Sequence, residues 1–578
     1  MPGGAGAGAT GQAKHPAFPM PDRPPADATT MTGGEAIVDA VAANGVDTLF
    51  GLPGAQIYPL FDAIARRGLQ LYVPRHEQAA AYMAMGYAKS TGRPAVFCVV
   101  PGPGVLNASA ALCTAMGNCS PVVCITGQVP SEYLGRGRGH LHELADQLGT
   151  LRGIVKDAMR IDSPGDAPRV VNDAFIGAAS GRPGPVAVEM CWDTMATSGR
   201  VLPLPPACRP PPPDPDPDAL EAAVRVLATA KKPMLMCGAG AQHAHAEVIA
   251  LAELLNAPVT AFRSGRGVVP EDHPLGVAAV AARELWDEVD VLVGVGSRLE
   301  MPYMRWRNPM RYDPRPPGPI LIRIDIDPAE MNRLRPDVAI VADSAAACRA
   351  IVDRLTARVR PSRDRTAEIA AAKATASRLI GTIRPQAEYL HVIRDVVPRD
   401  GFLVPEVSQV GFATYTGAWP VLAPRTYVTE GFQGTLGFGF QTALGVKAAH
   451  PHRVVVSING DGGFLFGVQE LATAARYGLG VVTLVFNNEA YGNVLRDQQT
   501  QFEGRVIGAE LTNPDFVALG ESFGVASYRA TSPAQLKPLL ERALTDGGPA
   551  LIEIRIERGA ETSPWSLIHM PRRPSERL

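Results

Sequence analysis

One stretch near the carboxyl end limits the possible folds more than any other part of the chain. The run RVVVSI at 453–458 is apolar and rich in β-branched residues, which predicts a buried strand. A glycine-rich turn, GDGG at 460–463, follows it, and residues 464–478 predict an amphipathic helix that ends on Gly478. The run VVTLVF at 481–486 predicts the next strand. Strand, helix and strand in this order indicate a parallel α/β sheet.

The same alternation of short β-branched runs and helical periodicity extends over most of the 578 residues. We therefore predict an α/β protein of three doubly wound parallel-sheet domains. The stretch LPLPPACRPPPPDPDPDAL predicts an extended spacer, and a charged, alanine-rich stretch at 360–381 predicts a helical connector. The expected segments are a disordered tail (1–30), an N-terminal domain (31–200), a proline-rich linker (201–217), a central domain (218–358), a second linker (359–381), a C-terminal domain (382–560) and a C-terminal tail (561–578).

Composition excludes several classes of function. The net charge is −2, with 55 basic and 57 acidic residues, which argues against a nucleic-acid binder or a membrane-surface protein. The longest apolar runs are strand-sized, far below the ~20 residues that a membrane span needs, and the amino-terminal region lacks the apolar core of a signal peptide. None of the eight cysteines forms a C-x-x-C pair, so we interpret most of them as core residues in a reducing compartment. We expect a cytoplasmic protein.

Polar residues follow both predicted strands of the opening stretch. Asp461 and Asn488 lie 27 residues apart, each after a strand, and the carboxyl ends of parallel strands are where open α/β sheets bind ligands. The adjacent glycines let backbone N–H groups approach phosphate oxygens. One carboxylate with amide and backbone oxygens forms a partial shell for Mg²⁺. Gly-Asp-Gly alone is an ordinary turn, but its combination with Asn-Asn at this spacing predicts a site for a magnesium diphosphate.

This combination resembles the thiamine diphosphate motif, in which GDG is followed at a distance by NN. The resemblance implies that the metal is bound by the side chains of Asp461 and Asn488 and by the main-chain carbonyl of Ala490. It also implies a set of further cofactor contacts, made by Gly460, Gly462, Gly463 and Tyr491.

Two other segments resemble the same family. RHEQAAAYMAMGYAKSTGRPA, from Arg75, supplies Glu77, and in the family a Glu at this place shares a proton with N1′ of the aminopyrimidine. Without the resemblance, Glu77 would be an acidic residue that favours a helix dipole. EGFQGTLGFGFQTALG, at 430–445, resembles the stretch that holds the cofactor in a bent shape. This implies that Leu436 wedges between the two rings and that the carbonyl of Gly434 accepts from the 4′-amino group.

The resemblance covers about residues 31 to 560, in the order pyrimidine-binding, central and diphosphate-binding domain, and is strongest to the acetolactate synthase large subunit. It implies thiamine diphosphate and Mg²⁺ as cofactors, decarboxylation of a pyruvate-like 2-oxo acid, and carboligation to a second carbonyl compound. Glu77 and the diphosphate site belong to domains that meet across a subunit interface in this family, which implies a homodimer or homotetramer. VPGPGVLNA and ITGQVP add Asn107 and Gln128 as candidate substrate residues.

The predicted substrate region departs from the acetolactate synthase pattern. GLPGAQ has Ala55 where the synthases carry a second glycine, and GRGRGHLHELADQ has His142 in the place of an active-site glutamine. An imidazole there is expected to move protons, and the alternative is a solvated ring or one paired with Glu143. Arg136 and Arg138 are candidates to hold a substrate carboxylate, and the alternative is a solvated loop.

Two departures lie in the C-terminal domain. SQVG keeps Gln409 as a cofactor-side residue, but Asp497 stands near the place of a Trp that helps the synthases accept a second substrate. A simple 2-oxo acid decarboxylase and a thiamine-dependent carbon–carbon hydrolase of a cyclic dione therefore stay open. Outside this class, the alternatives are a non-catalytic thiamine diphosphate-binding paralogue and a nicotinamide dehydrogenase, whose G-x-G-x-x-G pattern GDGGFLFG does not match.

The central domain contains two glycine-rich stretches, CGAGAQ and GVGSRLE. They leave open a structural flavin adenine dinucleotide (FAD) in this domain.

Overall fold

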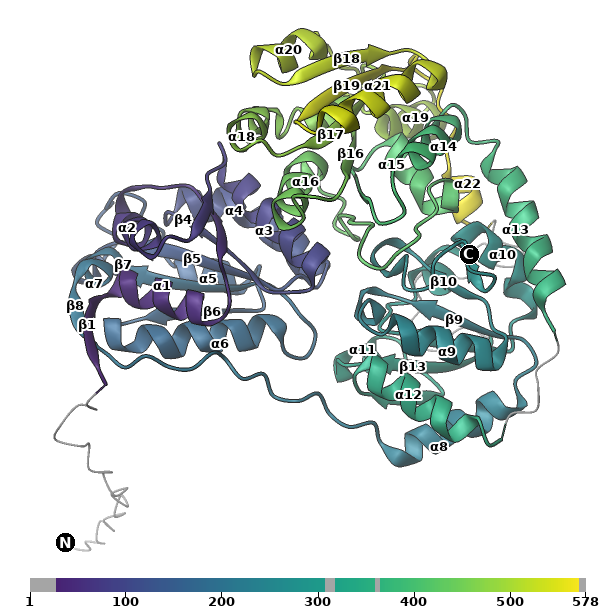
Figure 1. Cartoon of the computed structure of the whole chain (residues 1–578), viewed down its shortest axis with the longest axis horizontal. Coiled ribbons are helices and arrows are strands. Elements are labelled where there is room, and N and C mark those ends of the chain that lie inside the picture. The colour runs from purple at the N-terminus through teal and green to yellow at the C-terminus, as the bar shows by residue number, and fades with distance from the viewer. Residues whose placement is uncertain (1–26, 307–317, 359–363, 571–578) are drawn as a thin grey trace, which may run out of the picture.

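The computed structural model describes residues 27–306, 318–358 and 364–570, so most of the predicted tail at 1–30 lies outside the described residues. Figure 1 shows three domains: the N-terminal one in purple and blue, the central one in teal, and the C-terminal one in green and yellow. The strands pair in parallel within each main sheet, and helices alternate with them along the chain. The predicted fold class, α/β with three doubly wound parallel-sheet domains, is confirmed. No described helix has the length and apolar character needed to span a bilayer.

The N-terminal domain is a six-stranded sheet in the order β3-β2-β4-β5-β7-β6, and a short antiparallel pair joins β1 to β8. Alternate residues of β4 enter different cores, because successive side chains of a strand point to opposite faces. Val96 and Cys98 pack with helices α1, α2 and α6, whereas Ala95 and Phe97 pack with α3 and α4. The elements are β1 (Thr29–Thr32), α1 (Gly33–Ala43), β2 (Thr48–Gly51), α2 (Tyr58–Arg67), β3 (Gln70–Tyr72), α3 (Glu77–Thr91), β4 (Ala95–Val99), α4 (Pro103–Gly117), β5 (Val122–Gln128), α5 (Gln147–Arg152), β6 (Asp157–Ile161), α6 (Ala167–Ala179), β7 (Val186–Cys191), α7 (Trp192–Ala196) and β8 (Ser198–Val201).

The proline-rich stretch from 202 to 216 contains no helix or strand, and it runs from the N-terminal domain to the start of the central one (Figure 1). The central sheet has six strands in the order β11-β10-β9-β12-β13-β14. The stretch predicted as a helical connector forms α13 (Thr366–Ile380). The central elements are α8 (Pro217–Thr229), β9 (Pro233–Cys237), α9 (His245–Leu255), β10 (Val259–Ala261), β11 (Gly276–Val277), α10 (Ala279–Leu285), β12 (Val291–Val295), β13 (Ile320–Asp325), α11 (Pro328–Arg333), β14 (Val338–Val341) and α12 (Ser344–Leu355).

The C-terminal sheet has five strands in the order β15-β16-β17-β19-β18, and each of its faces belongs to a core shared with another domain. Phe402 and Val404 pack into the core shared with the N-terminal domain, where α16 lies against α3. Leu403 packs into the core shared with the central domain. The elements are α14 (Gln386–Val396), β15 (Phe402–Pro405), α15 (Gln409–Ala413), α16 (Phe438–Ala449), β16 (Val455–Gly460), α17 (Asp461–Phe464), α18 (Leu471–Tyr477), β17 (Val481–Asn487), α19 (Gly492–Gln501), α20 (Phe516–Ser522), β18 (Ala526–Ala530), α21 (Pro533–Asp546), β19 (Ala550–Arg555) and α22 (Trp565–Ile568).

The prediction of one continuous helix at 464–478 is wrong, since α17 ends at Phe464, a 3₁₀ turn follows at Val468–Glu470, and α18 begins only at Leu471. The helical backbone already begins at Asp461, inside the predicted turn. A Cβ on Gly467, between the two helices, would lie 2.7 Å from Cγ of Gln441, so the chain passes α16 where no side chain fits. Gly478 ends α18 in a left-handed conformation with φ of 62°, as predicted.

One buried side chain connects all three domains. Asn118 of the N-terminal domain donates from Nδ2 to the carbonyl of Thr429 at 2.6 Å, and its Oδ1 accepts from the hydroxyl of Ser264 at 3.0 Å. Thr429 belongs to the C-terminal domain and Ser264 to the central domain. Both polar ends of a buried amide are therefore satisfied by different domains, which fixes their relative position at this point.

Candidate functional site

The glycine-rich turn after β16 is shaped by close contacts. A Cβ on Gly462 would lie 2.4 Å from Cε1 of the Tyr491 ring, and a Cβ on Gly463 would lie 2.9 Å from Cγ of Glu406. Both distances are far inside van der Waals contact, so only glycine fits at these positions. The turn is thereby packed between the start of α19 and the end of β15.

Asp461 is the first residue of α17, and its side chain is buried. Its Oδ2 accepts from Nδ2 of Asn513 at 2.7 Å. Burial raises the pKa of Asp461, while the hydrogen bond from Asn513 and backbone N–H groups, including that of Ala490, oppose the rise. The carboxylate therefore lies beside the loop that follows β17, as the strand order of the sequence predicts.

Asn488 lies in that loop with both ends of its amide engaged. Its Oδ1 accepts from the N–H of Ala490 at 3.1 Å, and its Nδ2 donates to Oε2 of Glu561 at 2.5 Å. Burial raises the pKa of Glu561 to about 7, and the neighbouring Asp461 carboxylate adds to the rise, whereas Asn488 opposes it. The oxygen atoms of Asp461, Asn488 and Glu561 thus gather at this edge of the sheet.

The donor set fits Mg²⁺, which prefers carboxylate, amide and carbonyl oxygens. Two buried oxygens on this side of the sheet, Oε1 of Gln409 and Oδ1 of Asn513, have no hydrogen-bond partner within the described chain. Gln409 opens α15, and a Cβ on Gly492 would lie 3.3 Å from its Cγ, so it faces the start of α19. Such oxygens are suited to a bound cofactor or to ordered water.

The loop from 431 to 437 before α16 is held by a buried carboxylate. Glu406 accepts from the N–H of Gly437 at 2.7 Å and from the N–H of Gly439, and burial raises its pKa to about 8. Gly434 has φ of 62° and open space where a Cβ would point, and Leu436 is partly exposed. The two sequence-predicted residues, Gly434 and Leu436, thus lie on a fixed loop with room beside it.

Glu77 is the first residue of α3, whose N-cap is His76. The ring Nδ1 of His76 accepts from the N–H of Gln78 at 3.1 Å, which gives His76 a structural role as a helix cap. Oε2 of Glu77 accepts from Nδ2 of Asn107 at 3.0 Å, so a candidate substrate residue contacts the candidate catalytic acid. This contact lies within the N-terminal domain, apart from the carboxylates of the C-terminal domain.

His142 lies at φ of 65° in the loop between β5 and α5. Its Nδ1 is 2.9 Å from Oε1 of Gln56, while Nε2 of Gln56 donates to the carbonyl of Leu141 at 2.9 Å. Because the amide oxygen of Gln56 can only accept, Nδ1 carries the proton and a neutral ring presents Nε2 as an acceptor. Glu143 instead accepts from the backbone N–H groups of Gly137 and His140. The alternative of a His142–Glu143 pair is therefore wrong.

The other candidate substrate residues come from two loops and the end of a strand near His142, since Gln56, which follows Ala55, contacts His142 and lies against Gly127. Arg136 and Arg138 are exposed in the loop before His142, and Ala55 begins the 3₁₀ turn η1 (Ala55–Ile57). Gln128 is buried at the end of β5, where its Nε2 donates to Glu189 at 3.2 Å. Its amide is used inside the N-terminal domain.

Three residues beside the candidate site were not found from the sequence: Glu406, Asn513 and Glu561. Asn513 stands in NPDFVALGESFGV, a segment that shares the family resemblance, so a signal for it existed. Glu561 falls in the predicted C-terminal tail, and Glu406 follows a strand without a recognisable motif. Their positions depend on which loops meet in space.

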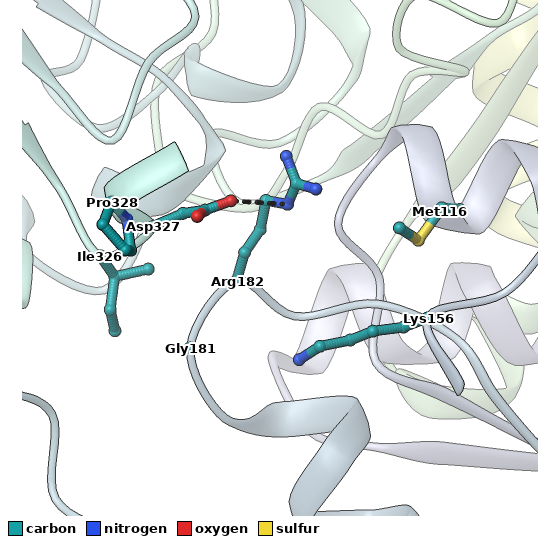
Figure 2. Close-up of a pocket in the computed structure, with 7 residues that line it drawn as sticks. All are labelled: Met116, Lys156, Gly181, Arg182, Ile326, Asp327 and Pro328. Carbon is teal, nitrogen blue, oxygen red and sulfur yellow. Dashed lines mark ion pairs between the residues drawn. The ribbon is translucent and has the colours of Figure 1, made fainter. Parts of the chain in front are cut away.

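A cavity of about 230 Å³ lies between the N-terminal and central domains (Figure 2). Arg182 and Lys156 line one side and Asp327 the other, and Nε of Arg182 lies 3.4 Å from Oδ2 of Asp327. The cavity is smaller than the ~300–1,000 Å³ typical of sites for cofactor-sized ligands.

The glycines of CGAGAQ and GVGSRLE pack on each other, since a Cβ on Gly238 would lie 2.1 Å from the carbonyl oxygen of Gly296. The two glycine-rich turns therefore lie against each other, after the neighbouring strands β9 and β12.

Comparison with known families agrees with this architecture. Three models of the thiamine pyrophosphate enzymes match the chain in order: the N-terminal TPP binding domain over residues 31–150, the central domain over 220–351, and the C-terminal TPP binding domain over 408–554.

Curated relatives match over almost the whole chain. The probable acetolactate synthase large subunit of Methanocaldococcus jannaschii is 33% identical over 91% of this chain and 92% of its own length. The acetolactate synthase isozyme 2 large subunit of Escherichia coli is 33% identical over 91% and 96%. The probable 2-ketoarginine decarboxylase of Pseudomonas aeruginosa is also 33% identical, over 91% and 94%. The chain therefore belongs to the thiamine pyrophosphate enzyme family and is similar to the acetolactate synthase large subunits within it.

Proposed function

We propose that the protein is an acetolactate synthase-like transferase and lyase. It decarboxylates a pyruvate-like 2-oxo acid and adds the remaining unit to a second carbonyl compound. The observation that carries the proposal is the meeting of Asp461 with the loop of Asn488 at the carboxyl edge of a parallel sheet, where Nδ2 of Asn513 donates to both Asp461 and Asn487. Thiamine diphosphate, when bound, supplies an electron sink for cleavage of the bond next to the 2-oxo group.

The C-terminal domain, in this proposal, holds the diphosphate through Mg²⁺. The carboxylate of Asp461, Oδ1 of Asn488 and the carbonyl of Ala490 bind the metal, and phosphate and water complete its shell. Support comes from Asn513, whose Nδ2 donates to Oδ2 of Asp461 at 2.7 Å and to Oδ1 of Asn487 at 2.9 Å, and so holds Asp461 beside the loop of Asn488. The residues that contact the cofactor are Gln409, Gly434, Leu436, Gly460, Gly462, Gly463 and Tyr491.

Glu77 holds a proton at N1′ of the aminopyrimidine, and Asn107 orients its carboxyl group. The hydrogen bond between the two side chains supports this pairing. In the acetolactate synthase-like family the domains that carry the equivalents of Glu77 and Asp461 meet across a subunit interface. We therefore propose a homodimer or homotetramer, in which each site combines the N-terminal domain of one chain with the C-terminal domain of another.

His142 acts on the substrate side through Nε2, with Nδ1 held by Gln56. Its replacement by Gln is expected to lower kcat for carbon dioxide release about 10²-fold, because a group that moves a proton is lost, while thiamine diphosphate binding stays unchanged. Steady-state kinetics over a range of pH, with cofactor titration, measure both. His140→Gln is the matched control, since His140 stacks on Tyr133 at 4.8 Å in the same loop. Equal kcat in wild type and His142→Gln would remove His142 from the mechanism.

The substrate candidates beside His142 are Ala55, Gln128, Arg136 and Arg138. A simple 2-oxo acid decarboxylase is the second candidate function, and the similarity to a probable 2-ketoarginine decarboxylase favours it. Asp497 also supports it, because this residue is hydrogen-bonded to Arg496 at 2.8 Å on α19 and makes the second-substrate region polar. Hydrolysis of a cyclic dione is the third candidate.

A panel of 2-oxo acids separates these functions. Pyruvate, 2-oxobutyrate and a 2-oxo acid with a guanidino tail are incubated with thiamine diphosphate and Mg²⁺, and carbon dioxide and product mass are recorded. We expect carbon dioxide from at least one acid, dependent on both cofactors, and a product of the mass of a condensed hydroxyketone. An aldehyde as the sole product would favour the decarboxylase. No carbon dioxide, together with cleavage of a cyclic dione, would favour the hydrolase.

The central domain has a structural role in this proposal. Decarboxylation and addition are redox-neutral, so FAD, if bound there, transfers no electrons. We further propose a cytoplasmic location, supported by the eight cysteines, which are all free thiols in the structure.

A further inference from the structure

The segment after the last strand, β19, returns to the candidate metal site. Glu561 lies in this segment and accepts from Nδ2 of Asn488 at 2.5 Å. Its pairing spans 73 positions of the sequence, so the contact is set by tertiary structure and not by a local turn. Neither the sequence motif nor the proposed ligand set uses this residue.

The residues that follow Glu561 are held in place by two other segments of the C-terminal domain. The N–H of Thr562 donates to the carbonyl of Arg384 at 2.9 Å, and Nε2 of the buried Gln386 donates to the carbonyl of Thr562 at 2.8 Å. Further on, the indole N–H of Trp565 donates to Oδ1 of Asn493 at 3.1 Å. The segment is thus fixed to α14 and to α19, and Glu561 has little freedom to leave Asn488.

An asparagine amide can present either its oxygen or its NH₂ group to a ligand, and its neighbours decide which. At Asn488 the NH₂ group is occupied by Glu561 at 2.5 Å, whereas Oδ1 lies by the N–H of Ala490 at 3.1 Å. The loop of Asn488 lies beside Asp461, because Nδ2 of Asn513 donates both to Oδ2 of Asp461 and to Oδ1 of Asn487. With its NH₂ group held by Glu561, the amide of Asn488 has only its oxygen left to present to a ligand at this edge of the sheet. Groups that orient a metal ligand in this way strengthen metal binding about 10- to 100-fold.

We propose that Glu561 is a positioning residue, which holds the amide of Asn488 so that its oxygen faces the divalent cation. The proposal rests on the metal site of the proposed function. In this proposal Glu561 accepts a hydrogen bond from the metal ligand Asn488 and does not itself bind the metal. The carboxyl-terminal segment thereby becomes part of the cofactor site.

Two substitutions of similar size separate the possible roles. Glu561→Gln keeps an oxygen that accepts from Asn488, and Glu561→Met removes it. Glu557→Met, at an exposed carboxylate of the same segment, is the matched control. Each variant and the wild type are titrated with Mn²⁺ by electron paramagnetic resonance in the presence of thiamine diphosphate, and folding is checked by circular dichroism.

We expect Glu561→Gln and Glu557→Met to keep the wild-type affinity for Mn²⁺ within about threefold, and Glu561→Met to weaken it about 10- to 100-fold. In an Asn488→Ala background, Glu561→Met should cause no further loss. Equal affinities of the Gln and Met variants, whether both strong or both weak, would overturn the proposal. If Glu561→Met does not fold, Glu561→Asp, which draws the carboxylate back by one methylene group, gives the same comparison. Absence of Mn²⁺ binding in the wild type would instead contradict the proposed function itself.

Discussion

Glu77→Gln is expected to lower the rate of carbon dioxide release about 10²- to 10⁴-fold. An amide in this place cannot share a proton with N1′ of the aminopyrimidine, although it can still accept the hydrogen bond from Asn107 that the structure shows. Binding of thiamine diphosphate and Mg²⁺ is expected to stay close to that of the wild type, because the proposed metal ligands lie in the C-terminal domain. Single-turnover kinetics measure the rate, and calorimetry measures the binding.

Glu132→Gln serves as the control, since Glu132 is an exposed carboxylate of the same domain. A Glu77→Gln enzyme that keeps most of its activity would show that the proton is held elsewhere. A variant that loses both cofactor binding and activity would show that Glu77 maintains the structure of the site and would not support a role in proton transfer.

Arg266→Met is expected to lower the free energy of unfolding by about 3–5 kcal/mol, because it leaves a buried carboxylate without its partner. The side chain of Arg266 is 1% exposed and pairs with Glu271 at 2.7 Å. It also donates to the carbonyls of Thr414 and Trp419, at 2.6 and 2.5 Å, and so joins the central domain to the C-terminal domain. Guanidinium titration followed by circular dichroism measures the loss.

The double variant Arg266→Met with Glu271→Met is expected to recover part of this loss, since both charges are then removed. Arg399→Ala is the matched control, because Arg399 and Asp272 form an ion pair between the same domains with side chains 57% and 48% exposed. Such an exposed pair contributes about 0–1 kcal/mol. If Arg266→Met lowers the free energy of unfolding no more than Arg399→Ala does, the buried pair contributes no more to stability than the exposed one, and the prediction is wrong.

The sequence predicted those features that repeat along the chain or stay within one motif. The alternation of strands and helices was sufficient for the three α/β domains, and the spacing of Asp461 and Asn488 predicted that their loops meet. The helix at 464–478 was predicted as continuous because its apolar pattern is continuous. Its break depends on the contact of Gly467 with Gln441, a residue of another helix.

The parts that could not be predicted depend on contacts between distant loops. Glu406 holds the loop of Gly437 and Glu561 holds Asn488, yet both come from segments without periodicity or a spacing rule. Asn513 stands in a segment that resembles the family, but its contact with Asp461 could not be predicted from that segment alone. The same holds for His142, where the motif gave the residue and only the contact with Gln56 gave the protonated nitrogen. The sequence therefore predicted a set of residues for the candidate site, but not the hydrogen-bond partners of those residues.

The proline-rich stretch from 202 to 216 joins two domains that are neighbours in sequence, but the N-terminal domain shares its core with the C-terminal domain, through α3 and α16. The stretch therefore acts as a tether. It keeps the N-terminal domain at a high effective concentration near the face of the C-terminal domain on which it docks, but it is not part of that face. Its length must suffice to reach, at ~3.3–3.6 Å for each extended residue. Its first part is attached to the N-terminal domain, where Nδ2 of Asn172 donates to the carbonyl of Pro205 and the N–H of Ala207 donates to Oδ1 of Asn44, both at 2.9 Å. Added residues are therefore expected to be tolerated in the exposed part, 208–214, where they would disturb neither these contacts nor the packed cores.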